Sequence, residues 1–109
     1  LADCRADCDA VLFILTLGAD GSSVFLADIE MKAEAPAIDD LADTVGAGDT
    51  YMASILCWVL ESGLTSRAAL AGIDEATLAK AAARAGEAAA INCQRSGCNP
   101  PWRHELANL

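Results

Sequence analysis

Basic residues are scarce in this sequence, and so are aromatic residues and long apolar runs. Seven lysines and arginines stand against 16 acids, which gives a formal net charge of −9. A surface of that sign repels nucleic-acid backbones and anionic membranes, so we expect neither as a partner. No apolar stretch approaches the roughly 20 residues that a membrane-spanning helix needs, and we recognise no signal peptide.

Cysteine pairs with the spacing of a structural metal site are also lacking. Neither Cys4 with Cys8 nor Cys93 with Cys98 has the two-residue gap common in zinc sites, and His104 is the only histidine. We therefore do not expect zinc. With Cys57 the cysteines number five, and an odd count without a secretion signal favours reduced thiols. The expected location is the cytoplasm.

Apolar residues make up 54% of the 109 residues, enough for one modest core. The apolar run at residues 11–16, rich in β-branched and aromatic side chains, predicts a buried central strand. Asp20 and Gly21 predict a hairpin turn, after which residues 22–27 return as a strand and residues 28–34 form another. Pro36 then breaks the pattern.

Beyond Gly48 the pattern becomes helical. The spacing predicts a helix over residues 51–60, stopped by Gly63. Its expected apolar stripe is Met52, Ile55, Leu56, Val59 and Leu60. Thr65 or Ser66 can cap a short helix, and Asp74 a longer one. The longer helix after Asp74 carries one apolar face, which implies close approach to a neighbouring helix or sheet. The residues of that face are Leu78, Ala81, Ala82, Ala85, Ala88 and Ala89.

The order of these elements predicts a layered α/β unit. One hairpin cannot cover two helices, so we expect the rest of the sheet to come from elsewhere. We therefore expect residues 1–109 to be a single-domain fragment of a longer protein.

The stretch DTVGAGDT, residues 43–50, stands directly before the predicted helix. A helix start leaves backbone N–H groups unpaired, and glycine removes the Cβ that would keep an anion away. Gly46, Ala47 and Gly48 are therefore candidate anion-binding donors. Asp49 is either an acid that offsets the helix dipole or a general base beside the anion, and Asp43 is either a turn former or a site residue. Spacing alone leaves both alternatives open.

Three stretches together resemble one family, the ribokinase-like (PfkB-type) carbohydrate kinases. They are DTVGAGDT before an apolar helix, TLGADG at residues 16–21, and AAAINCQRSGCNPP at residues 88–101. Their order and spacing match the family over nearly the whole chain from about residue 11. The closing GCNPP is most similar to the version in bacterial fructokinases. The resemblance implies the C-terminal portion of a three-layer α/β fold, with strand, hairpin, anion-hole loop and helices in that order.

The resemblance also implies roles for individual residues. Asp49 is expected to deprotonate a sugar hydroxyl while the amides of Gly46, Ala47 and Gly48 hold the transferring phosphoryl group. The residues expected to contact the nucleotide are Thr16, Gly18, Gly21 and Asn92. Those matching a monovalent-cation site are Asp43, Ser96 and Cys98, where Cys98 replaces the usual alanine. Tyr51 stands where phenylalanine is usual.

The implied partners are therefore a small sugar and ATP with Mg²⁺, and K⁺ is a further candidate cofactor. The family's chains are about three times as long as this one, and their other part carries the sugar contacts and an acidic metal-binding motif. We expect the isolated 109 residues to be nearly inactive, and the full-length protein to be a candidate homodimer. Two alternatives remain: an anion-binding or structural module without turnover, and the same fold acting on a nucleoside or a sugar acid.

Overall fold

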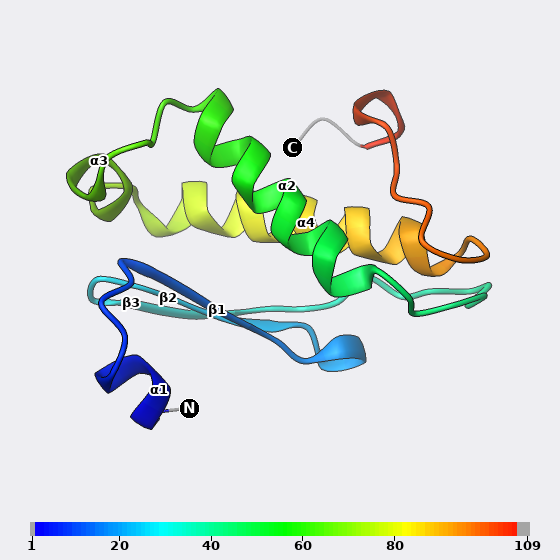
Figure 1. The fold of residues 1–109 in the computed structure, drawn as a ribbon, viewed down its shortest axis with the longest axis horizontal. Coiled ribbons are helices and arrows are strands. Elements are labelled where there is room, and N and C mark those ends of the chain that lie inside the picture. Colours follow the sequence, from blue (N-terminus) through cyan, green and yellow to red (C-terminus); the bar gives the residue numbers. More distant parts are fainter. Residues whose placement is uncertain (1, 107–109) are drawn as a thin grey trace.

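The computed structural model describes residues 2–106, so residues 1 and 107–109 of the expected unit lie outside the described part. A small sheet carries helices on one face and a short helix beyond the other (Figure 1). The elements are α1 (Ala2–Ala6), β1 (Leu12–Thr16), β2 (Ser22–Leu26), β3 (Ile29–Ala33), α2 (Ala47–Glu61), α3 (Arg67–Ala71) and α4 (Glu75–Cys93), with 3₁₀ turns at Gly18–Asp20 and Arg103–Glu105. This order confirms the predicted strand, hairpin, loop and helices. No helix within residues 2–106 combines the length and apolar character needed to cross a bilayer.

The sheet is antiparallel, in the order β1-β2-β3. Leu12 pairs with Leu26 and Thr16 with Ser22, so alternate residues of both strands face the helices. The expectation of a central strand at residues 11–16 is wrong within the described chain, because β1 lies at the sheet edge and only β2 is buried along its whole length. A continuous apolar run indicates that both faces of a strand are covered. It does not indicate whether the strand pairs with one neighbouring strand or with two.

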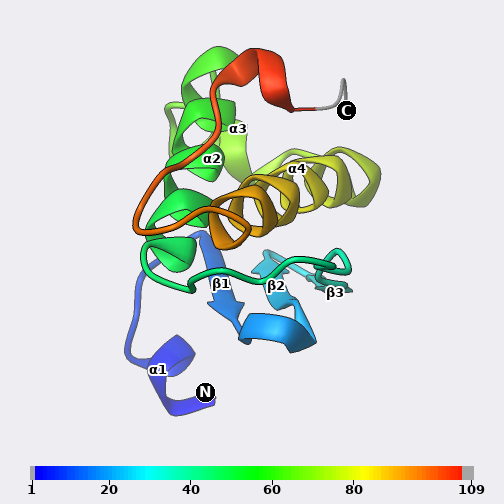
Figure 2. The ribbon, with the colours of Figure 1, turned by 90° about the vertical axis from the view of Figure 1, so that its right-hand side faces the viewer.

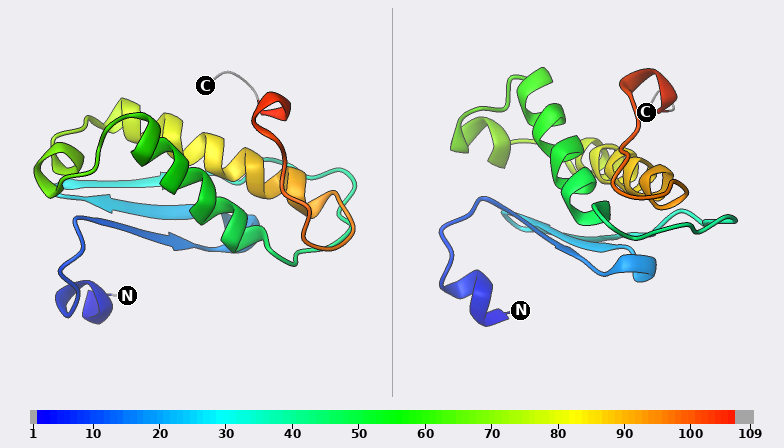
Figure 3. Two further views of the ribbon diagram at one scale, coloured as in Figure 1. Left: turned by 45° about the horizontal axis from the view of Figure 1, so that its top comes forward. Right: turned by 45° about the vertical axis from the view of Figure 1, so that its right-hand side comes forward.

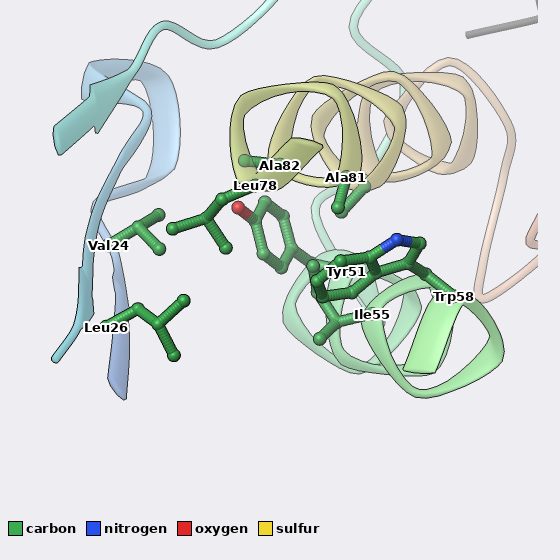
Figure 4. Close-up of a cluster of buried hydrophobic side chains, with 9 residues drawn as sticks. Val24, Leu26, Tyr51, Ile55, Trp58, Leu78, Ala81 and Ala82 are labelled. Carbon is green, nitrogen blue, oxygen red and sulfur yellow. The ribbon is translucent and has the colours of Figure 1, made fainter. Parts of the chain in front are cut away.

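The core lies between the sheet and the two long helices, which lie on the same side of the sheet and cross each other at an angle (Figure 1, Figure 2). Figure 4 shows Tyr51, Ile55 and Trp58 of α2 meeting side chains from β2 and α4. These three residues follow the spacing i, i+4, i+7 and are the buried face of α2. The predicted stripe is therefore wrong in part, since Met52, Leu56 and Leu60 are 57%, 53% and 69% exposed. Two aromatic residues on the adjacent face, Tyr51 and Trp58, take the core positions instead.

The alanine-rich face of α4 behaves as predicted. Leu78, Ala81, Ala82, Ala85 and Ala88 are all at most 5% exposed, and their small side chains let α4 lie close to α2 and β3. The expected caps are confirmed, because the Asp74 side chain accepts a hydrogen bond from the Thr77 N–H (2.7 Å) and Ser66 Oγ accepts one from the Ala69 N–H (3.1 Å).

Candidate functional site

A cavity of about 500 Å³ lies where one end of the sheet meets the start of α2 and the last turns of α4. That volume is within the usual range for small-molecule sites. Its walls come from five places: the β1–β2 turn (Thr16, Gly18, Gly21), residues 34–38 after β3, the loop before α2 (Leu41, Thr44), the start of α2 (Ala47, Gly48, Tyr51), and α4 (Gly86, Ala89, Ala90, Cys93). The two glycine-containing loops that the sequence singled out therefore open onto one space.

The β1–β2 turn is a tight 3₁₀ turn that closes with a hydrogen bond from the Leu17 N–H to the Gly21 carbonyl (2.7 Å). Gly21 has φ +84°, and a Cβ placed on it would lie 2.0 Å from the carbonyl oxygen of Ala33 in β3. Only glycine satisfies both conditions. Thr16, Gly18 and Gly21 all line the cavity, and their contact with a nucleotide stays a prediction.

The loop before α2 is ordered by its own hydrogen bonds. The Asp43 carboxylate accepts a bond from the Val45 N–H (3.0 Å), which is the turn-forming role. Gly46 has φ +80° and is the N-cap of α2. Its carbonyl accepts bonds from the N–H (2.9 Å) and the hydroxyl (2.8 Å) of Thr50. The helix thus begins at Ala47, within the quoted motif, rather than at residue 51 as predicted.

Three backbone N–H groups at this helix start have no hydrogen-bond partner among residues 2–106: those of Gly46, Gly48 and Asp49. The Ala47 N–H is different, because it donates to the Thr44 carbonyl (3.2 Å). The expected donor set of Gly46, Ala47 and Gly48 therefore needs one correction, with Asp49 N–H in place of Ala47 N–H. Placing the helix start at Ala47 would have added Asp49 to the unpaired amides of the first turn, but not revealed the bond from Ala47 to Thr44.

The Asp49 side chain is exposed, and within the described chain no hydrogen bond or ion pair involves it. It follows Gly48, which lines the cavity, but is not itself part of the cavity wall. The carboxylate is therefore unpaired within the described chain, next in sequence to the cavity wall at Gly48. The cavity wall also holds a buried polar pair, in which Tyr51 Oη and Ser22 Oγ share a hydrogen bond of 2.9 Å. Burial raises the pKa of Tyr51 and the bond to Ser22 lowers it by less, so this phenol stays protonated at neutral pH.

Asn92 is placed differently from the expected nucleotide contact. Its side chain is fully buried and does not line the cavity. Its Nδ2 donates to the Val45 carbonyl (2.8 Å), and its Oδ1 accepts from the Asn99 N–H (2.9 Å). The amide is thus held by backbone groups on both sides.

The residues assigned to a cation site lie on two adjoining loops, which Figure 3 shows next to each other beyond the end of α4. One loop carries Asp43, and the other carries Ser96 and Cys98. A Cβ on Gly46 would lie 2.3 Å from Cys98 Sγ, so the thiol packs directly against the first loop. Across residues 2–106, no group of three or more acidic, histidine or cysteine side chains is arranged to hold a metal ion.

Comparison with known proteins identifies the family. The family model described as pfkB family carbohydrate kinase matches residues 5–105, so the chain belongs to the pfkB family of carbohydrate kinases. A fructokinase of Rhizobium leguminosarum bv. trifolii is 35% identical over 69 residues, which are 63% of this chain and 21% of that protein.

Solved structures confirm the ribokinase-like α/β fold. Aminoimidazole riboside kinase from Salmonella enterica, complexed with aminoimidazole riboside and an ATP analog, matches with a TM-score of 0.64 at 29% identity, over 85% of this chain and 28% of that one. Fructokinase from Vibrio cholerae O395, in a form bound to fructose, ADP and calcium ion, matches with a TM-score of 0.66 at 24% identity, over 88% of this chain and 29% of that one. The chain therefore spans less than a third of the length of these relatives.

Proposed function

We propose that this chain is the ATP-binding and general-base portion of a sugar kinase, most like a fructokinase, which transfers the γ-phosphoryl group of ATP to a sugar hydroxyl. The observation that carries the proposal is the start of α2. There the free amides of Gly46, Gly48 and Asp49 stand beside an unpartnered carboxylate, and Gly48 lines a cavity shared with the β1–β2 turn. A site for phosphoryl transfer needs mainly positioned donors and a proton acceptor.

Each group has one task in this mechanism. The sugar oxygen attacks the γ-phosphorus, the bond from phosphorus to the β–γ bridging oxygen breaks, and ADP leaves. Asp49 takes the proton of the attacking hydroxyl. The free amides and the positive end of the 15-residue helix α2 stabilise the charge on the moving group. A base must touch the acceptor rather than the nucleotide, which agrees with Asp49 lying outside the cavity wall.

Two metal ions belong to the proposal, Mg²⁺ and K⁺, and the described residues offer candidate ligands only for K⁺. Mg²⁺ would neutralise phosphate charge when it arrives with ATP, and the described residues offer it no cluster of acidic side chains, so no step here depends on a protein ligand to magnesium. For K⁺ the candidates stay Asp43, Ser96 and Cys98. One Asp43 carboxylate oxygen accepts the Val45 N–H, and the loops that carry these residues adjoin.

The proposal also covers which molecule accepts the phosphoryl group and whether the chain is active by itself. We propose that residues 1–109 act as one unit, that they are nearly inactive without an acceptor-binding portion, and that the complete protein works in the cytoplasm, with a homodimer as its candidate assembly. The match to a riboside kinase at 29% identity keeps a nucleoside acceptor as the second candidate, and a sugar acid is a further alternative. Anion binding without turnover, or a purely structural module, is the other alternative.

ATP with Mg²⁺ is expected to raise the melting temperature of the chain, and Gly48→Ala is expected to reduce that rise. A ligand that binds only the native state stabilises it by mass action. A Cβ on Gly48 meets no atom within 4 Å, so alanine fits the helix and adds about 0.5–1 kcal/mol of stability. The same Cβ would occupy space in front of the free amides. The melting temperature without ligand should therefore rise while the ATP response falls.

The matched control is Gly72→Ala, a glycine in the αR conformation at the end of α3 and outside the cavity wall. Its ATP response should equal that of the unmodified chain. Absence of any ATP response in a folded sample would contradict nucleotide binding. A full response in Gly48→Ala would place the phosphates elsewhere.

A further inference from the structure

The orientation of the Asn92 amide is fixed by its partners. The Asn99 N–H can only donate and the Val45 carbonyl can only accept, so Oδ1 must face Asn99 and Nδ2 must face Val45. The side chain is 0% exposed, and a buried amide held on both sides has little freedom to turn.

The bond to Val45 bears directly on the free amides, because the Val45 carbonyl and the Gly46 N–H belong to one peptide group. A peptide group is planar and trans, so its C=O and N–H point in opposite directions. A donor that holds the carbonyl therefore also sets the direction of the Gly46 N–H. Since Nδ2 holds the carbonyl from one side, the N–H is directed away from Asn92.

Neighbouring contacts hold the same loop from the end of α4. The Cys93 carbonyl accepts hydrogen bonds from the N–H groups of Ala42 (2.8 Å) and Asp43 (3.1 Å). Cys98 Sγ lies against Gly46, where any Cβ would collide with it. The loop before α2 therefore packs against the last turn of α4 and the loop that follows it.

We propose that Asn92 is a positioning residue, whose buried side-chain amide orients the Gly46 N–H for binding a phosphoryl oxygen. The binding of a phosphoryl oxygen rests on the proposed function. The hydrogen bonds that fix the Gly46 peptide do not depend on that function. Asn92 itself is not needed as a ligand contact, because both ends of its side-chain amide are already bound to backbone.

The variant that tests this is Asn92→Asp, which has the same shape. An ionised carboxylate keeps an acceptor for the Asn99 N–H but replaces the donor that faces the Val45 carbonyl with an oxygen, whereas a protonated one could still donate, so the affinities are measured over a range of rising pH. Two facing acceptors repel, so the Val45–Gly46 peptide should leave its present orientation. We expect the affinity for ATP, measured by calorimetry, to fall about tenfold, the usual effect of one hydrogen bond. The affinity for adenosine, which carries no phosphate, should change by less than about twofold.

The matched control is Gln94→Glu, which makes the same amide-to-carboxylate change at an exposed position two residues further along the chain. It should leave both affinities unchanged. Equal losses for ATP and adenosine in Asn92→Asp would show a general structural defect and overturn the proposal. Unchanged ATP affinity in that variant would also overturn it.

Nuclear magnetic resonance of the unmodified chain decides the question if Asn92→Asp does not fold. The Asn92 side-chain amide protons should exchange slowly with solvent, and a coupling across the hydrogen bond should join Nδ2 to the Val45 carbonyl carbon. Rapid exchange with no such coupling would overturn the proposal. If the unmodified chain binds no ATP, the proposed function fails, and the coupling still decides whether Asn92 orients the Gly46 peptide.

Discussion

Asp49→Asn is expected to lower the turnover number for phosphoryl transfer by about 10²–10⁴-fold, the usual contribution of a general base. Asparagine keeps the size of the side chain and the backbone N–H, but its amide cannot accept the proton of a sugar hydroxyl. Because the side chain lies outside the cavity wall, the affinity for ATP should change by less than about twofold. The loss should therefore appear in kcat and not in the KM for ATP.

We propose to make the measurement in a chimera. The part of this chain that matches the Vibrio cholerae fructokinase replaces its counterpart there, which is 29% of that chain. Asp40→Asn is the matched control, since it removes the same charge from an exposed position before the motif and should leave kcat unchanged. If Asp49→Asn lowered kcat and ATP affinity together, Asp49 would be an acid that stabilises the helix start rather than a base.

Gly21→Ala is expected to lower the free energy of unfolding by roughly 2–5 kcal/mol, the sum of a left-handed backbone and steric overlap. The new Cβ would lie 2.0 Å from the Ala33 carbonyl oxygen, and backbone on a paired strand cannot turn aside as a side chain can. Natural domains are stable by only about 5–15 kcal/mol, so the variant would lose much of its margin. Urea unfolding followed by circular dichroism measures the change.

Gly18→Ala separates the two causes. Gly18 has φ +59°, but a Cβ on it meets no atom within 4 Å, so only the backbone penalty of about 1–2 kcal/mol applies. Gly21→Ala should therefore cost clearly more than Gly18→Ala. Equal costs would mean that β3 shifts to make room, and that the close approach of β3 is not what requires glycine in the turn.

Features set by residues near one another in the chain could be predicted from the sequence. The Asp74 side chain caps α4 through Thr77, three residues on, and Asp43 closes a turn through Val45, two residues on. Both follow from side-chain chemistry that acts locally. The three motifs likewise indicated the family and the two loops, because each is a short, continuous run of residues.

Features that depend on distant partners could not be predicted in this way. Met52 and Tyr51 lie on adjacent faces of the same helix, and only the packing of β2 and α4 selects Tyr51 for the core. The edge position of β1 depends on which strands pair, which a single apolar run does not record. Asn92 acts on Val45 across 47 positions of sequence, so its spacing carries no signal of the contact.

The central claim is that the unpaired amides at the start of α2 hold the phosphoryl group of ATP. A titration of the ¹⁵N-labelled chain with ATP and Mg²⁺, followed by amide resonances, tests it most directly. We expect the largest downfield shifts at Gly46, Gly48 and Asp49, and a small shift at Ala47, whose N–H already donates to Thr44. ATP binding that left those three amides unmoved, or that moved Ala47 as much as its neighbours, would contradict the account.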